Sequence, residues 1–224
     1  MQGKLAALGQ TFMNTVKWSI SSSMIRGVTR AFTSTIDYAK ELNKDLTQIR
    51  IVTGKSVEDI SRFAVEANKA AKALSATTSE YAKASLIYFQ QGLDGNAVAE
   101  RTATTLKLAK VVGESAETTS EWMTAIWNNF DDGSRSLENY ADVLAKLGAA
   151  TASSADEIAG GLEKFAAVAE TVGLSYEYAA SALATITAET RQSEDVVGTA
   201  LKTIFARVEN LKLGETLEDG TTLG

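Results

Sequence analysis

Residues 188–207 read AETRQSEDVVGTALKTIFAR, and this stretch indicates a helical protein more clearly than any other. It predicts the end of one helix, a polar turn and the start of a second helix. Ser193 suits an N-cap, and Glu194 and Asp195 place negative charge in the first turn, where the helix dipole favours it. Apolar side chains then recur at helical spacing on one face, at Val197, Leu201, Ile204, Phe205 and Val208. No group here is suited to catalysis, which indicates a structural role.

The composition also favours helices. The 224 residues include no proline, although an average usage of about 5% would supply roughly 11. Proline is the strongest helix breaker, and no segment shows the strict two-residue alternation of a half-buried strand. We therefore predict an all-α fold, a multi-helix bundle of short helices and helical hairpins preceded by a long N-terminal helix.

Cysteine and histidine are both absent from the chain. Their absence removes disulfides, thiolate nucleophiles, zinc sites built from Cys and His, and histidine-based triads. A carboxylate pair or a lysine in a cleft is the catalytic alternative that stays open, but the sequence marks no residue for it. We expect no catalytic, cofactor-binding or metal-binding residues and no enzymatic activity.

Charge is distributed unevenly along the chain. Residues 1–36 contain four basic residues and no acidic one, whereas the remainder has 18 basic and 28 acidic residues. This basic, amphipathic start is typical either of a helix that packs on a partner, which we favour, or of a helix at a membrane surface. No apolar run reaches the roughly 20 residues needed to span a bilayer. The acidic remainder argues against nucleic-acid binding as the main task.

A long amphipathic helix is predicted over residues 1–53, ending at Gly54. Its apolar side chains recur every four residues, at Phe12, Val16, Ile20, Met24, Val28, Phe32 and Ile36. A four-residue step overshoots the helical turn by about 40°, so this row winds around the helix. The weak helix formers Ser21 to Ser23 and Gly27 predict a break or bend.

Residues 54–213 form the predicted helical core, divided by caps and glycines into short helices. Thr77 with Glu80 has the spacing of a capping box, as does Ser154 with Glu157. The first box starts a helix that ends at GLD, residues 92–94, and the second starts one that ends at GLS, residues 173–175. These patterns predict two similar hairpins about 80 residues apart. Residues 214–224 are a polar tail, which we interpret as a cut within a longer protein.

Three features that resemble sites have plainer explanations. Residues 128–133, NNFDDG, place acids before a glycine as a calcium loop does, but the third position is Phe130 and a turn is the better interpretation. Gly160 and Gly161 lack the neighbouring Lys-Ser/Thr of a phosphate loop, and we expect them to permit close helix packing. Glu66, Lys69 and Lys72 have the spacing of a solvated helix face.

Aromatic residues gather within one predicted helix, at Trp122, Trp127 and Phe130, together with Ile126. An exposed binding patch would explain them, but aromatic residues at helical spacing are more often part of a core. We predict that they are buried.

The wording of several segments resembles phage tail tape measure proteins, and the resemblance spans nearly the whole chain. The most specific block is TRQS followed by VVGTALKTIFAR, residues 190–193 and 196–207. Further blocks are TVKW (15–18), SSSM (21–24), IVTGKS (51–56), FAVEANKA (63–70), YAKASLIY (81–88), QQGL (90–93), residues 152–157 and VGLS (172–175). The wording is most similar to long-tailed phages and prophages of Gram-positive bacteria.

The resemblance implies a structural protein of the virion. Tape measure proteins occupy the lumen of the tail tube, set tail length during assembly in the host cytoplasm, and leave through the tip at infection, when the genome is ejected. The implied partners are other copies of the chain, the tail tube protein, tail assembly chaperones and tail-tip proteins. Some relatives carry peptidoglycan-cleaving domains, but no segment here matches one.

A continuous helix of 224 residues would reach about 340 Å at 1.5 Å per residue. The caps and glycines instead predict short helices that fold on one another. Our hypothesis is that this bundle opens or extends when it enters the tube. The alternative is a membrane-active protein that contacts the host membrane through residues 1–36.

Overall fold

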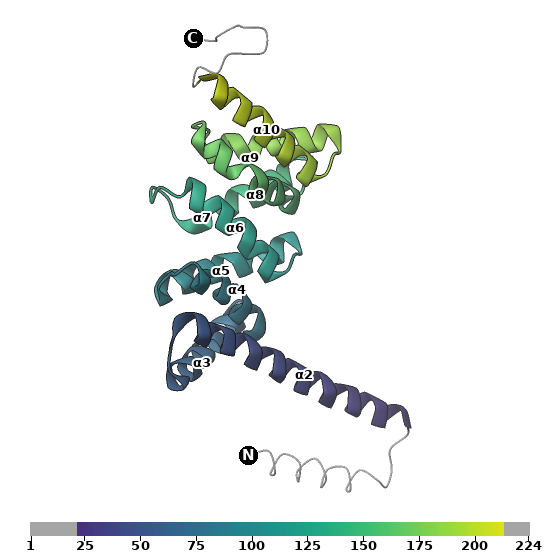
Figure 1. The fold of residues 1–224 in the computed structure, drawn as a ribbon. Helices are drawn as coiled ribbons and strands as arrows, with labels where there is room; N and C mark the ends of the chain where they lie inside the picture. Colours follow the sequence, from purple (N-terminus) through teal and green to yellow (C-terminus); the bar gives the residue numbers. More distant parts are fainter. Residues whose placement is uncertain (1–21, 213–224) are drawn as a thin grey trace. The chain divides into compact units, whose positions relative to one another are not determined.

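The computed structural model describes residues 22–212, and every regular element within this part of the chain is an α-helix (Figure 1). This confirms the prediction of an all-α fold. The helices are α2 (Ser22–Thr53), α3 (Val57–Ala73), α4 (Thr78–Gln90), α5 (Gly95–Val112), α6 (Ala116–Phe130), α7 (Leu137–Ala150), α8 (Ala155–Thr171), α9 (Tyr176–Thr190) and α10 (Glu194–Lys212).

The chain divides into two compact units, Met1–Lys44 and Asp45–Gly224. In the first unit, α2 is continuous through Gly27, where a break or bend was predicted. Residues 1–21, which carry the start of the predicted N-terminal helix, lie outside the described residues. The last turns of α2 belong to the second unit, where the Ser79 hydroxyl donates a hydrogen bond of 2.9 Å to the buried Asp45 carboxylate.

Helix starts in the second unit follow local capping chemistry. The backbone N–H of Thr77 donates to Glu80 Oε2 at 2.6 Å, and the N–H of Glu80 donates to Thr77 Oγ1 at 3.2 Å, which confirms the first predicted capping box. In the second box, the N–H of Ser154 donates to Glu157 Oε2 at 2.9 Å. Each box satisfies N–H groups that the first helical turn leaves without an intrahelical partner.

Helix ends use the left-handed backbone conformation. Gly92 has φ 78° and Gly173 has φ 77°. The N–H of Leu93 donates to Tyr88 O at 3.4 Å, and the N–H of Leu174 donates to Ala169 O at 2.8 Å. These are the six-to-one hydrogen bonds of Schellman caps, and they close α4 and α8 in the same way.

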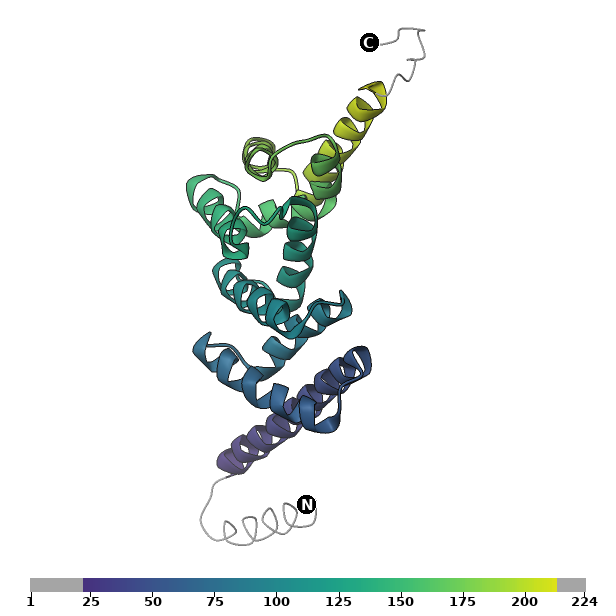
Figure 2. The ribbon, with the colours of Figure 1, turned by 90° about the vertical axis from the view of Figure 1, so that its left-hand side faces the viewer.

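Packing in the second unit joins near neighbours along the chain. From α3 to α10, every extensive helix–helix contact joins helices that are one or two places apart in the sequence. Helices α4, α6, α8 and α10 form a first row, in which each contacts the next, and α5, α7 and α9 form a second row (Figures 1 and 2). This neighbour-only pattern is typical of repeat proteins.

The repeat has a nearly constant length. The first-row helices begin at Thr78, Ala116, Ala155 and Glu194, so their starts are spaced by 38, 39 and 39 residues. The two similar hairpins predicted from the sequence are α4–α5 and α8–α9. The structure places a third hairpin, α6–α7, between them, so the offset of about 80 residues spans two repeats.

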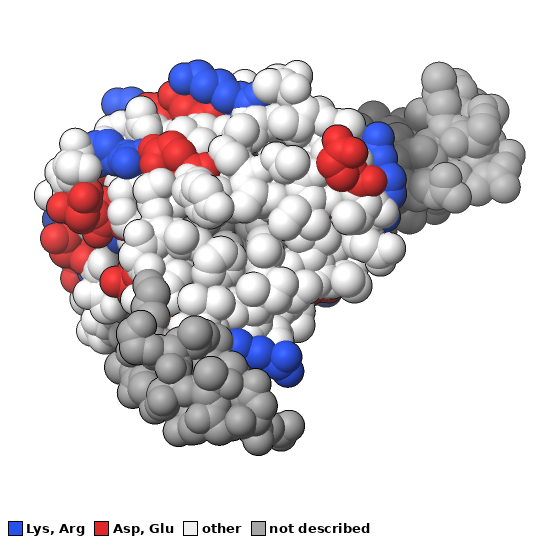
Figure 3. Space-filling view, turned by 90° about the horizontal axis from the view of Figure 1, so that it is seen from above, with Lys and Arg blue, Asp and Glu red and all other residues white. Residues whose placement is uncertain are grey.

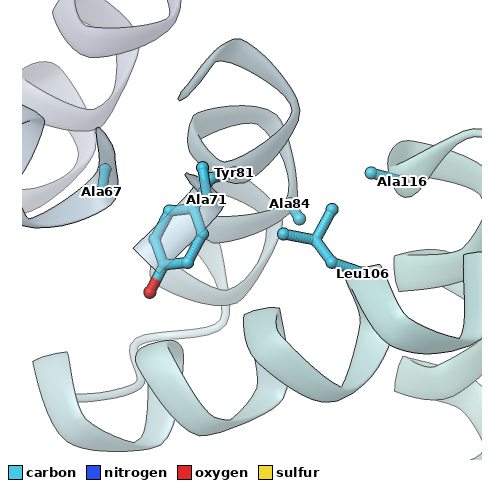
Figure 4. Packing of buried hydrophobic residues seen from close by; sticks show 6 residues of the cluster. All are labelled: Ala67, Ala71, Tyr81, Ala84, Leu106 and Ala116. Carbon is cyan, nitrogen blue, oxygen red and sulfur yellow. The ribbon is translucent and has the colours of Figure 1, made fainter. Parts of the chain in front are cut away.

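Small side chains let the helices approach closely. One cluster of buried residues contains four alanines, and its members are Ala67, Ala71, Tyr81, Ala84, Leu106 and Ala116 (Figure 4). Buried hydroxyls between α4 and α5 pair with each other, Tyr88 with Thr105 at 2.5 Å and Ser85 with Thr102 at 3.1 Å. Buried hydroxyl groups without such partners would destabilise the fold.

We expect Gly173→Ala to lower the free energy of unfolding by about 1 to 2 kcal/mol, because a Cβ disfavours the left-handed conformation. Gly95→Ala is the matched control, since Gly95 has no positive φ and open space around its Cβ position. That change should leave stability unchanged or raise it by up to about 1 kcal/mol. Urea denaturation of both variants tests this, and equal effects would contradict the proposed cap.

Candidate functional site

The most specific sequence block folds into the last part of α9, a turn and α10, and it packs on α8. A Cβ added to Gly198 of α10 would lie 2.6 Å from the carbonyl oxygen of Gly161 in α8, closer than real Cβ contacts. A Cβ at Gly161 would meet the Leu183 side chain at 2.7 Å. The prediction that the Gly160–Gly161 pair permits close helix packing is therefore confirmed. The sequence interpretation did not single out Gly198, although a glycine inside a helix pattern is itself a signal of close approach.

Aromatic and polar contacts surround this crossing. The rings of Phe165 and Phe205 have centroids 5.4 Å apart. In the turn before α10, Arg191 has φ 55° and its Nη1 donates to the Ala152 carbonyl at 2.9 Å. The ion pair between Lys164 and Asp195, at 3.6 Å, is exposed to solvent and contributes little to stability. These contacts hold α10 in place, and we identify no group here that is arranged for chemistry.

The predicted apolar face of α10 is only partly buried. Val197 and Leu201 are buried and Phe205 is half-buried, as a core face requires. Ile204 and Val208 are exposed, and the prediction is wrong for these two. The physical reason is that α8 and α9 cover one side of α10, whereas no described helix covers the other.

The aromatic residues of α6 are mostly core, as predicted. Trp127 and Ile126 are fully buried, and Trp127 Nε1 donates to the Leu137 carbonyl at 3.2 Å. Trp122 and Phe130 are half-buried. The Phe130 ring contacts Tyr176 with centroids 5.5 Å apart, so it joins α6 to α9.

The acidic segment at residues 128–133 ends in a turn, which confirms that interpretation. Asp131 Oδ1 accepts a hydrogen bond from Gly133 N at 3.1 Å, and Asp132 Oδ1 accepts one from Ser134 N at 2.9 Å. The hydrogen bond from the Ser134 side chain is the main cause that lowers the pKa of Asp132. Within residues 22–212, no group of three acidic, His or Cys residues is placed to hold a metal ion.

A surface cleft of about 480 Å³ lies between α3, α4 and α5. Its floor is apolar, and the ammonium of Lys55 at its rim lies 5.0 Å from the centre of the Phe89 ring. The carboxylate of Asp59 accepts hydrogen bonds from Ser56 and Arg62, which lower its pKa. Asp59 is therefore engaged in capping α3 rather than poised for proton transfer.

Charged residues elsewhere behave as solvated faces. Glu66, Lys69 and Lys72 are all exposed on α3, as predicted. No helix between residues 22 and 212 combines the length and the hydropathy needed to cross a membrane. Most of the basic segment 1–36, on which the membrane alternative depends, lies outside the described residues.

A family model described as phage-related minor tail protein matches residues 68–221, which is more than half of the chain. The match begins inside α3 and includes all of α4 to α10. No solved structure matches the chain.

Gly198→Ala should destabilise the protein by about 1 to 3 kcal/mol, because the added methyl group overpacks two backbones that cannot both retain their positions. Gly160→Ala is the matched control, since its Cβ would meet only the flexible Glu194 side chain, at 3.0 Å. The control should change stability little or raise it through the better helix propensity of alanine. Chemical denaturation measures both, and a harmless Gly198→Ala would contradict the crossing.

Alkaline pH should destabilise the fold through buried tyrosine. Burial raises the pKa of Tyr88 to about 12, against about 10 in an unfolded chain. The stability that its neutral form contributes is full below pH 10 and is lost as the pH rises from 10 through 12. Tyr88→Phe should therefore reduce the fall of unfolding free energy by up to about 1.4 kcal/mol per pH unit in that window. The control is Tyr178→Phe, at an exposed position, which should leave the pH profile unchanged.

Proposed function

The chain belongs to the phage-related minor tail protein family, and from that premise we propose that it acts as the folded helical region of a tape measure protein. In this role it enters the lumen of the tail tube, contributes to tail length and leaves when the genome is ejected. The family itself supports a structural role in a phage tail. The finer role is supported by the resemblance of the sequence blocks described above.

The observation that carries the proposal is the neighbour-only packing of α3 to α10. In such an array each repeat is stabilised by its own contacts and by those with the adjacent repeats. The array can therefore open from one end, one repeat at a time, without first losing a shared core. A protein that is stored folded and extends on entering a narrow tube needs this property.

The same packing relates repeat number to length. An opened repeat of about 39 residues that forms continuous helix would add about 60 Å at 1.5 Å per residue. The absence of proline from the sequence is consistent with a chain that can form one unbroken helix after its turns have opened.

The proposed partners follow from this location. They are further copies of the chain, the tail tube protein, the tail assembly chaperones and the tail-tip proteins, with assembly in the host cytoplasm before incorporation into the virion. The membrane alternative is the second candidate, and the acid-free, basic composition of residues 1–36 favours it. It would leave the matched region, residues 68–221, without a role.

Duplicating residues 116–154 in frame, in a phage that encodes the chain, should lengthen the tail by about 60 Å. This segment is one complete repeat from the start of α6 to the residue before α8, so the duplication preserves the packing register. Deletion of the same residues is the reciprocal control and should shorten the tail equally. Electron microscopy of negatively stained particles measures both. Virions that contain the enlarged protein but have unchanged tails would contradict a ruler role and leave the tail role intact.

A further inference from the structure

The exposed apolar surface of α10 occupies a position that is buried in every other first-row helix. Counted from the first residue of its helix, Ile204 is the eleventh residue of α10. The eleventh residues of α4, α6 and α8 are Tyr88, Ile126 and Phe165. All three have an exposed fraction of 0%, whereas that of Ile204 is 54%.

In the earlier repeats, the next first-row helix contributes to this burial. Tyr88 of α4 contacts Trp127 of α6 with ring centroids 6.0 Å apart, and Phe165 of α8 contacts Phe205 of α10 at 5.4 Å. In both pairs the eleventh residue of one helix meets the twelfth residue of the next first-row helix. Ile204 stands where such a contact would form again.

The surface around Ile204 is shaped and uncharged enough to receive a helix. An open hollow on α10 is lined by Asp195, Val196, Thr199, Ala200, Thr203 and Ile204, and five of these six residues are uncharged. A view from the α10 side of the molecule shows a broad face without charged side chains, with lysine, arginine and acidic residues toward its margins (Figure 3). An apolar surface of this kind, rimmed by charge, is typical of a docking site.

We propose that this face of α10 is the docking surface for a further repeat of the same polypeptide, supplied by the chain that follows Lys212. The next first-row helix would lie on α10 as α10 lies on α8, and would bring a large apolar side chain at its twelfth position against Ile204. An origin in the same chain follows from the register, because each earlier first-row helix is covered by the next one of its own polypeptide. The family match also continues past the end of α10, to residue 221.

One residue restricts the second-row helix that would precede that first-row helix. Ala200 of α10 corresponds to Gly161 of α8, being the seventh residue of its helix. A Cβ at Gly161 would meet Leu183 of α9 at 2.7 Å. A second-row helix docking on α10 therefore needs a side chain smaller than leucine at the place that Leu183 occupies in α9.

Thiol reactivity at position 204 tests the proposal, because the chain contains no cysteine and the Ile204→Cys variant would carry a single thiol. In the 224-residue chain this thiol should react with Ellman's reagent as fast as that of Lys202→Cys, an exposed position on the opposite side of α10. The rate should not depend on protein concentration. A slow rate that increases on dilution would mean that a second copy covers the face, and it would overturn the proposal.

The second arm supplies the missing repeat to the Ile204→Cys variant. A copy of residues 173–212 is appended directly after Lys212, once unchanged and once with the copied leucine of position 183 replaced by alanine. Far-UV circular dichroism should show added helix, and the alanine version should slow the reaction of the thiol at position 204 by about tenfold or more. The Lys202→Cys control should react at an unchanged rate in the same extended chain. If neither appended repeat becomes helical, or if both do so without slowing the thiol at position 204, the proposal is wrong.

Discussion

Helix α10 crosses α8 at a point where neither backbone carries a side chain, with Gly198 directly over the carbonyl of Gly161. This contact determines how close the two helices lie and which side of α10 faces the rest of the protein. Val197 and Leu201 are buried because the crossing turns them toward α8 and α9. The same geometry leaves Ile204 in solvent, so one backbone contact accounts for both the stable seam and the open surface.

The remainder of the second unit applies the same principle with larger side chains. Tyr88 against Trp127 joins α4 to α6, as Phe165 against Phe205 joins α8 to α10. Because each row helix contacts only the helices near it in sequence, stability is distributed along the unit rather than gathered in one core. Buried polar groups such as the Tyr88 and Thr105 hydroxyls pair with each other within a repeat. These features are typical of a protein whose task is assembly, in agreement with its family.

The helix boundaries were predictable, whereas the full repeat was not. Thr77 with Glu80 and Ser154 with Glu157 marked two hairpins, because a capping box needs only residues three apart. The hairpin of α6 and α7 was missed because Ser115 has Thr118, not Glu or Gln, at the matching place. Its turn also uses aspartates at 131 and 132 instead of the Gly-Leu pattern that closes α4 and α8. Two of three hairpins were therefore visible, and their common offset looked like one long interval.

By itself, the sequence determined that this protein is helical, where most of its helices begin and end, and that it carries no cysteine or histidine chemistry. Caps and left-handed glycines act within a few residues, so they are legible without knowledge of the fold. Only the tertiary structure decided which apolar side chains are buried. Phe165 and Ile204 occupy equivalent helix positions, yet one is covered and the other is open. Burial depends on a helix about 39 residues further along the chain, and no local pattern records whether that helix is in place.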